Sequence, residues 1–277
     1  MSSPADRTCV AMVGGGSMGG AIVEGIVSGV PDARVIVVEA NEELAEKWRS
    51  RGDVEVLPLA DAVSGATVVF LAVKPPQITE VLREAAPDIR PGTAVVSIAA
   101  GVPLSSLESC VGEDVAVVRA MPNTPVRVGR GAVGVAAGRG CTDETLEKVS
   151  ALLGPVATVV TIPESSIDAL TATSGSGPAY VFYLAEAMNK AAVDLGLDAA
   201  TASTLVAETI LGAGLLLAAS PDDPAALRAA VTSKGGTTAA ATRVFDERGL
   251  PDIVWSAMQA CVDRAEEMVR EQADVDR

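Results

Sequence analysis

The chain contains no histidine among its 277 residues, and this absence narrows the chemistry that is open to it. Without histidine there is no imidazole general base, no His–Asp proton relay and no histidine metal ligand. Hydrolases with the usual Ser-His-Asp triad are excluded for the same reason. Any enzymatic activity of this protein must therefore proceed without an imidazole.

Aromatic and basic residues are also scarce. Phe, Trp and Tyr make up 3% of the chain, which argues against stacking platforms for nucleic-acid bases. Lys and Arg number 21 against 36 Asp and Glu, so the formal net charge is −15. Because nucleic acids and anionic membranes attract basic clusters, we expect neither of them as a partner.

The four cysteines are far apart and include no Cys-x-x-Cys pair. A disulfide framework or a zinc site is therefore not expected, and no metal site of any kind is predicted. Residues 1–8 carry two charges and lack the apolar segment of a secretory signal. We accordingly expect a protein of the reducing cytoplasm.

What the chain does have is apolar residues, which form 49% of it, against 21% charged residues. This composition excludes disorder, and the length suggests about two domains. Up to residue 163, short β-rich segments alternate with helical segments, which predicts βαβ units and a mainly parallel sheet. The expected strands are residues 9–13, 35–38, 54–57, 67–73, 93–99, 115–119, 132–136 and 156–162.

Residues 164–277 are expected to be almost entirely helical. The expected helices are residues 169–195, which residues 174–178 (Ser-Gly-Ser-Gly-Pro) interrupt, and residues 198–218, 224–231, 237–247 and 252–272. Several of them, such as residues 205–219, are apolar nearly all round. A domain of this size cannot bury such helices by itself, so we predict a subunit interface here.

A glycine-rich loop follows the first predicted strand and opens the first predicted helix. Residues 14–19 read Gly-Gly-Gly-Ser-Met-Gly and satisfy the pattern G-x-G-x-x-G. Glycines there let the backbone turn tightly and approach a pyrophosphate, which the helix N-terminus attracts. We therefore predict an α/β fold with an N-terminal Rossmann-type dinucleotide-binding domain. Its expected pyrophosphate residues are Gly14, Gly15, Gly16, Ser17, Met18 and Gly19.

Glu39 stands at the end of the second predicted strand, twenty residues after Gly19. A carboxylate there accepts hydrogen bonds from the adenosine ribose and repels a 2′-phosphate, which favours NADH. Asn41 or Arg49 could still meet a phosphate, so NADPH and NADH both remain open as cofactors.

A second loop with candidate functional residues comes before the predicted helix 237–247. Residues 232–238 read Thr-Ser-Lys-Gly-Gly-Thr-Thr. Small residues and hydroxyls at a helix start form a nest of N–H groups that suits a carboxylate. A simple N-cap after a glycine loop is the alternative interpretation.

Four sequence blocks, in order along nearly the whole chain, resemble the pyrroline-5-carboxylate reductase family. They are residues 72–75, 119–125, 174–180 and the C-terminal block 224–246. In the last block, Thr242 stands where the family usually has an aliphatic residue, and Lys234 stands where proline is common. Neither difference removes a hydroxyl or a glycine.

The resemblance implies reduction of 1-pyrroline-5-carboxylate to L-proline, the last step of proline biosynthesis, with hydride from NADPH or NADH. Thr238 is implied to be the catalytic residue, which hydrogen-bonds the imine nitrogen. The implied substrate residues are Glu164, Ser233, Gly235, Gly236, Thr237 and Thr238. Besides the glycine loop and Glu39, the implied cofactor residues are Val73, Lys74, Pro75, Ala100 and Asn123.

The resemblance also implies a homodimer through an all-α dimerisation domain, residues 164–277, often assembled as a decamer of five dimers. The implied substrate is a cyclic imine that accepts hydride directly once it is protonated. The protein then needs only to position it against the nicotinamide, with solvent as our expected proton source. The absence of histidine is compatible with this reaction.

Three alternatives remain at this point. A β-hydroxyacid dehydrogenase would carry a catalytic lysine at the position of Val181. A ketol-acid reductoisomerase would need paired carboxylates for Mg²⁺, for which Glu186 and Asp194 are the candidates. A non-enzymatic NAD(P)-binding sensor would have lost its substrate chemistry, whereas residues 233–238 are intact.

Overall fold

The computed structural model describes residues 8–275, which form two compact units. Unit 1 contains the chain up to residue 175 together with the residues from 261 onward, and unit 2 contains residues 176–260. This division falls later than residue 163, and the boundary between sequence domains stays a prediction. Residues 1–7, where no signal segment is expected, lie outside the described residues.

Unit 1 is built on a sheet of eight strands in the order β3-β2-β1-β4-β5-β6-β7-β8. Neighbouring strands are parallel except for β6 and β7, which are antiparallel. The predicted α/β fold with a mainly parallel sheet is therefore confirmed. The strands are β1 Cys9–Val13, β2 Arg34–Val38, β3 Glu55–Val56, β4 Val68–Leu71, β5 Ala94–Ser97, β6 Ala116–Pro122, β7 Gly131–Ala137 and β8 Ala157–Thr161.

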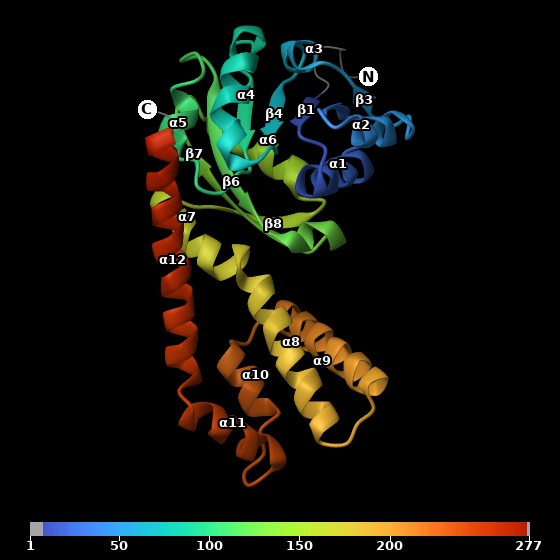
Figure 1. Cartoon of the computed structure of the whole chain (residues 1–277), viewed down its shortest axis with the longest axis vertical. Coiled ribbons are helices and arrows are strands. Elements are labelled where there is room, and N and C mark those ends of the chain that lie inside the picture. The colour runs from blue at the N-terminus through green and yellow to red at the C-terminus, as the bar shows by residue number, and fades with distance from the viewer. Residues whose placement is uncertain (1–7, 276–277) are drawn as a thin grey trace. The chain divides into compact units, whose positions relative to one another are not determined.

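Helices cover both faces of the sheet, so its central strands are buried on both sides (Figure 1). This double burial explains why these strands are continuous apolar runs. Val10 and Met12 face one apolar cluster, whereas Ala11 and Val13 face the other. The first cluster includes α1 Ser17–Gly29, α2 Glu42–Arg49 and α6 Asp143–Leu153; the second includes α3 Leu59–Ser64, α4 Ile78–Ala85 and α5 Leu104–Glu108.

Capping hydrogen bonds from side chains fix the starts of two helices. The Leu44 N–H donates to Asn41 Oδ1 at 3.0 Å at the start of α2. The Thr145 N–H donates to Thr142 Oγ1 at 3.2 Å at the start of α6. Each side chain satisfies a backbone donor that has no partner within its helix.

The helical segment expected over residues 169–195 is divided near the interruption that its sequence shows at residues 174–178. The chain forms α7 Ile167–Leu170, then a π-helical turn over Thr171–Gly175, and then α8 Gly177–Asp194. Pro178 lies in the first turn of α8, where a missing N–H is harmless, although in a helix interior it would remove a hydrogen bond. The residues before it therefore adopt a separate turn.

Unit 2 is helical and exposes many large apolar side chains. Phe182, Leu216 and Trp255 are each 67% exposed. By length and composition α9 could cross a membrane, and 11% of its apolar window is buried within the chain. A patch of this kind requires cover by another surface. The unit comprises α8, α9 Ala199–Ala219, α10 Pro224–Ala230, α11 Thr237–Glu247 and the first part of α12 Leu250–Val275.

Candidate functional site

The predicted cofactor residues gather at one edge of the sheet. The last residues of the parallel strands are in register, since Val13 lies opposite both Val38 and Leu71. The strand order reverses between β1 and β4, and open α/β sheets bind ligands beyond the carboxyl ends at such a point. The predicted residues follow five of these ends: Gly14 to Gly19 after β1, Glu39 after β2, Val73 to Pro75 after β4, Ala100 after β5 and Asn123 after β6.

Each of the three glycines of the G-x-G-x-x-G motif is favoured at its position for a different structural reason. Gly14 has φ +104°, and a Cβ on it would lie 2.8 Å from the Ala72 carbonyl. A Cβ on Gly19 would collide with the Gly14 carbonyl oxygen, because α1 packs closely on the loop. A Cβ on Gly16 would meet no atom within 4 Å. The open side of the loop is therefore at Gly16, where a pyrophosphate needs room.

The first turn of α1 fits an anion. Gly16 is its N-cap, and no side chain caps the helix. The first backbone N–H groups of a helix have no partner inside the helix, and the helix dipole makes this end positive. The loop therefore offers N–H donors around Ser17 and Met18 to a pyrophosphate.

The side chains of Glu39, which follows β2, and Trp48, which lies in α2, hold the backbone N–H and carbonyl of Gly15. The Gly15 N–H donates to Glu39 Oε2 at 2.8 Å, and the Gly15 carbonyl accepts a hydrogen bond from Trp48 Nε1 at 3.0 Å. The other Glu39 oxygen accepts the Asn41 N–H at 2.9 Å. Sequence reasoning assigned no role to Trp48. The signal it missed is that a buried indole N–H normally needs an acceptor.

Arg51 supports Trp48 from the solvent side. Its guanidinium lies 5.3 Å from the centroid of the Trp48 ring, and it forms an ion pair with Asp53 at 2.8 Å. The hydrogen bond from Arg51 lowers the pKa of Asp53 below its usual value. The cation over the ring is therefore held in place, which favours the observed orientation of the indole.

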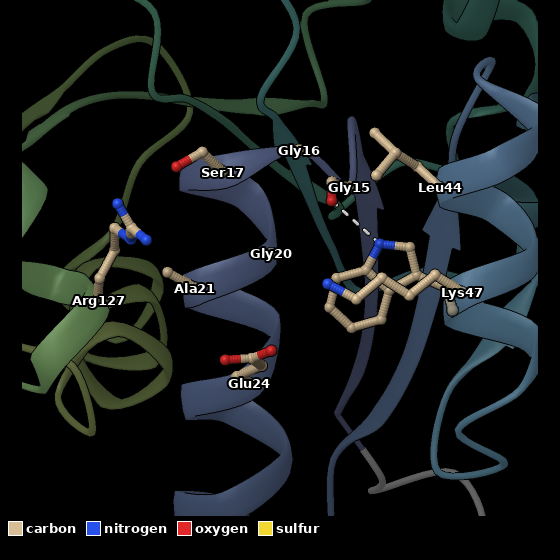
Figure 2. A pocket seen from close by; sticks show the side chains of 10 residues that line it. Gly15, Gly16, Ser17, Gly20, Ala21, Glu24, Leu44, Lys47 and Arg127 are labelled. Atoms are coloured by element: carbon tan, nitrogen blue, oxygen red, sulfur yellow. Dashed lines mark hydrogen bonds between the residues drawn. The ribbon is translucent and has the colours of Figure 1, made fainter.

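A cavity of about 440 Å³ opens beside the glycine loop (Figure 2). Lys47 and Arg127 line it from opposite sides of α1. Neither side chain forms an ion pair with a residue in the described part of the chain, whereas Glu24 in the same cavity is paired with Arg51. Sequence reasoning did not single out either cation. Two unpaired cations next to a helix N-terminus make this part of the surface electrostatically favourable for an anion.

Replacing Trp48 by phenylalanine tests how the loop is held. The Gly15 carbonyl would lose its donor, and an unsatisfied buried acceptor lowers the free energy of unfolding by about 1–3 kcal/mol. Urea unfolding followed by circular dichroism measures this change. Arg49→Ala is the control on the same helix, because Arg49 pairs only with exposed carboxylates. Equal stability of Trp48→Phe and Arg49→Ala would contradict the role of the indole N–H.

The side chains of Glu164 and Asn123 form hydrogen bonds with other residues of unit 1. Glu164 Oε1 accepts hydrogen bonds from the Leu104 N–H at 2.7 Å and from Arg119 Nη1 at 3.0 Å. The Asn123 side chain accepts the Ala132 N–H and donates to the Ser174 carbonyl, at 2.9 and 3.0 Å. Sequence reasoning missed Arg119, although a charged residue inside an otherwise apolar strand was the available signal.

The predicted substrate loop belongs to unit 2 and runs into α11. Gly235 has φ +72°, which favours glycine at that position. The Gly236 N–H donates to the Ser233 carbonyl at 3.0 Å, so this amide is already committed within the loop. Thr238 is half-buried, and its hydroxyl has no hydrogen-bond partner among the described residues. The start of α11 thus presents the Thr237 amide and the Thr238 hydroxyl.

Comparisons with known proteins decide the family. A family model described as pyrroline-5-carboxylate reductase dimerisation matches residues 164–268, and one described as NADP oxidoreductase coenzyme F420-dependent matches residues 9–101. A pyrroline-5-carboxylate reductase of Corynebacterium melassecola is 41% identical over 266 residues, which cover 94% of this chain and 98% of the relative. The chain belongs to the pyrroline-5-carboxylate reductase family.

Further relatives agree with this assignment. The Pseudomonas aeruginosa pyrroline-5-carboxylate reductase is 38% identical, over 95% of this chain and 97% of its own length. The solved pyrroline-5-carboxylate reductase of Coxiella burnetii has a TM-score of 0.91 and 32% identity, over 95% of this chain and 99% of that one. The match to the dimerisation model accounts for the exposed apolar helices of unit 2, which a homo-oligomer covers.

Proposed function

We propose that this protein reduces 1-pyrroline-5-carboxylate to L-proline with hydride from NADPH or NADH, as the last step of proline biosynthesis. The observation that carries the proposal is the 41% identity across 98% of the Corynebacterium melassecola reductase. The β-hydroxyacid dehydrogenase, ketol-acid reductoisomerase and sensor alternatives gain no comparable support. Ketol-acid reductoisomerase resembles the chain in fold, at 18% identity and a TM-score of 0.66.

The proposed roles follow the two loops. The amides around Ser17 and Met18 bind the pyrophosphate, and Val73, Lys74 and Ala100 line the nicotinamide half of the cofactor. Lys74 is exposed and forms no ion pair with a described residue, which leaves its charge available. In unit 2, Ser233 and the Thr237 amide hold the substrate carboxylate.

The main task of the protein in this reaction is to orient the imine relative to the nicotinamide. When bound, the reduced nicotinamide supplies a hydride, which forms the new C–H bond at the carbon of the protonated C=N group. The electron pair of the C=N bond passes to nitrogen, which becomes the amine of proline. Thr238 orients the imine N–H, and the proton on the imine comes from solvent. Positioning alone accelerates such a step substantially.

Absorbance of the reduced nicotinamide tests the function directly. Purified protein is mixed with 1-pyrroline-5-carboxylate and NADH or NADPH in parallel reactions. Oxidation of either cofactor with formation of proline is the expected result. Measurable cofactor binding without oxidation of either one would reject the reductase and favour the sensor.

We propose further that NADH is the preferred cofactor. The Glu39 carboxylate is held by two backbone N–H groups at the adenosine end of the site. The residues of the following turn add Glu42 and Glu43 rather than cations. Arg49 is paired with Glu42 and Glu46, and Asn41 caps α2, so neither is free to compensate a 2′-phosphate.

Glu39→Gln is the matched test, because its amide oxygen still accepts a loop N–H. The change is expected to raise kcat/KM for NADPH relative to NADH by about 10-fold, since charges about 4 Å apart at a partly exposed site repel by roughly 1–4 kcal/mol. Steady-state rates with both cofactors measure the ratio. An unchanged ratio would remove Glu39 from cofactor selection.

We also propose a homodimer through residues 164–268, assembled as five dimers in a soluble, cytoplasmic decamer. The apolar helices of unit 2 and the dimerisation match support the dimer. Sedimentation equilibrium distinguishes dimer from decamer. A monomer at micromolar concentration would contradict both.

A further inference from the structure

A partly buried ion pair lies at the loop between β5 and α5, residues 98–103, which we call the β5–α5 loop. Arg119 Nη1 lies 3.0 Å from Glu164 Oε1, and the two side chains are 6% and 35% exposed. Within residues 8–271, every other ion pair that the structure describes has both side chains at least 31% exposed. This pair is therefore the one least screened by solvent.

The same carboxylate oxygen holds the end of the β5–α5 loop. Glu164 Oε1 accepts the Leu104 N–H at 2.7 Å, and Leu104 is the first residue of α5. The N-cap residue Pro103 provides no side-chain acceptor for this helix. Glu164 thus supplies from 60 residues away the acceptor that a capping residue would normally provide.

The β5–α5 loop borders the space proposed for the nicotinamide half. Ala100 and Gly101 line a cavity of about 410 Å³ with Pro75 and Pro76, which follow β4. All these residues belong to unit 1. Gly101 has φ +77°, and a Cβ on it would lie 3.6 Å from Met268 Cβ. A shift of the loop would therefore change the width of this cavity.

The physical cost of the pair points to a positioning role. Burying the Arg119 charge is expensive even beside a carboxylate, and apolar side chains in place of such a pair often give equal or greater stability. Removing one partner leaves the other charge buried and unpaired. The ion pair therefore contributes little to stability. Its hydrogen bonds instead fix the position at which the β5–α5 loop ends.

We propose that Arg119 and Glu164 are positioning residues, which hold the β5–α5 loop so that the nicotinamide half lies at the correct distance from the substrate. This inference rests on the proposed reductase function. It assigns Glu164 to the cofactor side of the reaction rather than to direct binding of the imine.

Glu164→Ala tests the proposal in the full-length protein. Binding of ADP-ribose, which has the adenosine half and the pyrophosphate but no nicotinamide, is titrated calorimetrically to count intact sites. We expect kcat per intact site at saturating substrates to fall about 10- to 100-fold, the cost of a small misplacement of reacting groups. The Kd for ADP-ribose is expected to stay unchanged, because the glycine loop is untouched.

Two further variants separate positioning from general destabilisation. Glu164→Gln keeps an oxygen that accepts the Leu104 N–H, so it should restore most of the lost kcat. Glu108→Ala removes another carboxylate-to-amide hydrogen bond on α5, the one to the Arg139 N–H at 2.6 Å. It should preserve kcat per intact site. Arg119→Lys keeps the charge without the guanidinium geometry, and an intermediate kcat is expected.

The possible results separate this inference from the function on which it rests. Glu164→Ala with the same kcat per intact site as Glu108→Ala would overturn the positioning role while leaving the reductase intact. A raised KM for 1-pyrroline-5-carboxylate with unchanged kcat would overturn it in favour of direct substrate binding. Wild-type protein that binds ADP-ribose but oxidises neither cofactor would reject both proposals.

Discussion

Replacing Thr238 by alanine is expected to lower kcat/KM for 1-pyrroline-5-carboxylate by about 10- to 1000-fold, the scale of one oriented hydrogen-bonding group in a reaction site. Thr238 lies in the first turn of α11, is half-buried, and has a hydroxyl without a partner among the described residues. The hydroxyl is therefore held on a helix yet available to the imine nitrogen. Steady-state kinetics at varied imine concentration measures the loss.

Thr238→Ser and Thr242→Ala are the controls for this effect. Serine keeps the hydroxyl and should retain most of the activity. Thr242 lies one turn later, and its hydroxyl donates to the Thr238 and Ala239 carbonyls, so it is committed to the helix itself. Its loss should leave kcat/KM near that of the wild type. Wild-type kcat/KM in Thr238→Ala would show that Thr238 has no catalytic role.

Gly19→Ala is expected to lower the stability of the protein, whereas Gly16→Ala is expected to weaken its binding of the dinucleotide. At Gly19 the new Cβ would collide with the Gly14 carbonyl oxygen and lie 2.9 Å from Ala72 Cβ. Such overpacking lowers the free energy of unfolding by about 1–3 kcal/mol. At Gly16 the Cβ would meet no atom of the described protein within 4 Å. Stability should be unchanged there, while affinity for the dinucleotide falls.

Chemical unfolding and calorimetric titration with NADH separate the two effects. We expect Gly16→Ala to raise the Kd for NADH by about 10-fold or more, because its methyl group occupies the space through which the pyrophosphate approaches the backbone. Gly65→Ala is a control for glycine replacement, since it also meets no atom within 4 Å but lies away from the loop. Normal NADH affinity in Gly16→Ala would place the pyrophosphate elsewhere.

The strands and long helices of this protein could be predicted because their patterns are local. Residues 9–13 and 67–73 are continuous apolar runs, which sheets buried on both faces require, and they became β1 and β4. The caps Asn41 and Thr142 are local in the same way, because a cap acts within its own helix turn. The glycine loop was identified from spacing alone, and each of its glycines has a steric reason in the structure.

The short helices and the direction of β7 could not be predicted from local sequence patterns. α3 and α5 have six and five residues, and helices of that length persist only through packing. β7 runs antiparallel to β6, yet a buried strand has the same apolar pattern in either direction.

Local sequence patterns were sufficient to identify the dinucleotide loop, the alternating fold of unit 1, the helical character of unit 2 and the family. How the candidate site is held depends on contacts between distant parts of the chain. Gly15 is bonded to Glu39 and Trp48, which are 24 and 33 residues away, and Glu164 is bonded to Arg119 across 45 residues. The physical reason is that local spacing sets strands, turns and caps, whereas the order of strands in the sheet sets which distant side chains meet.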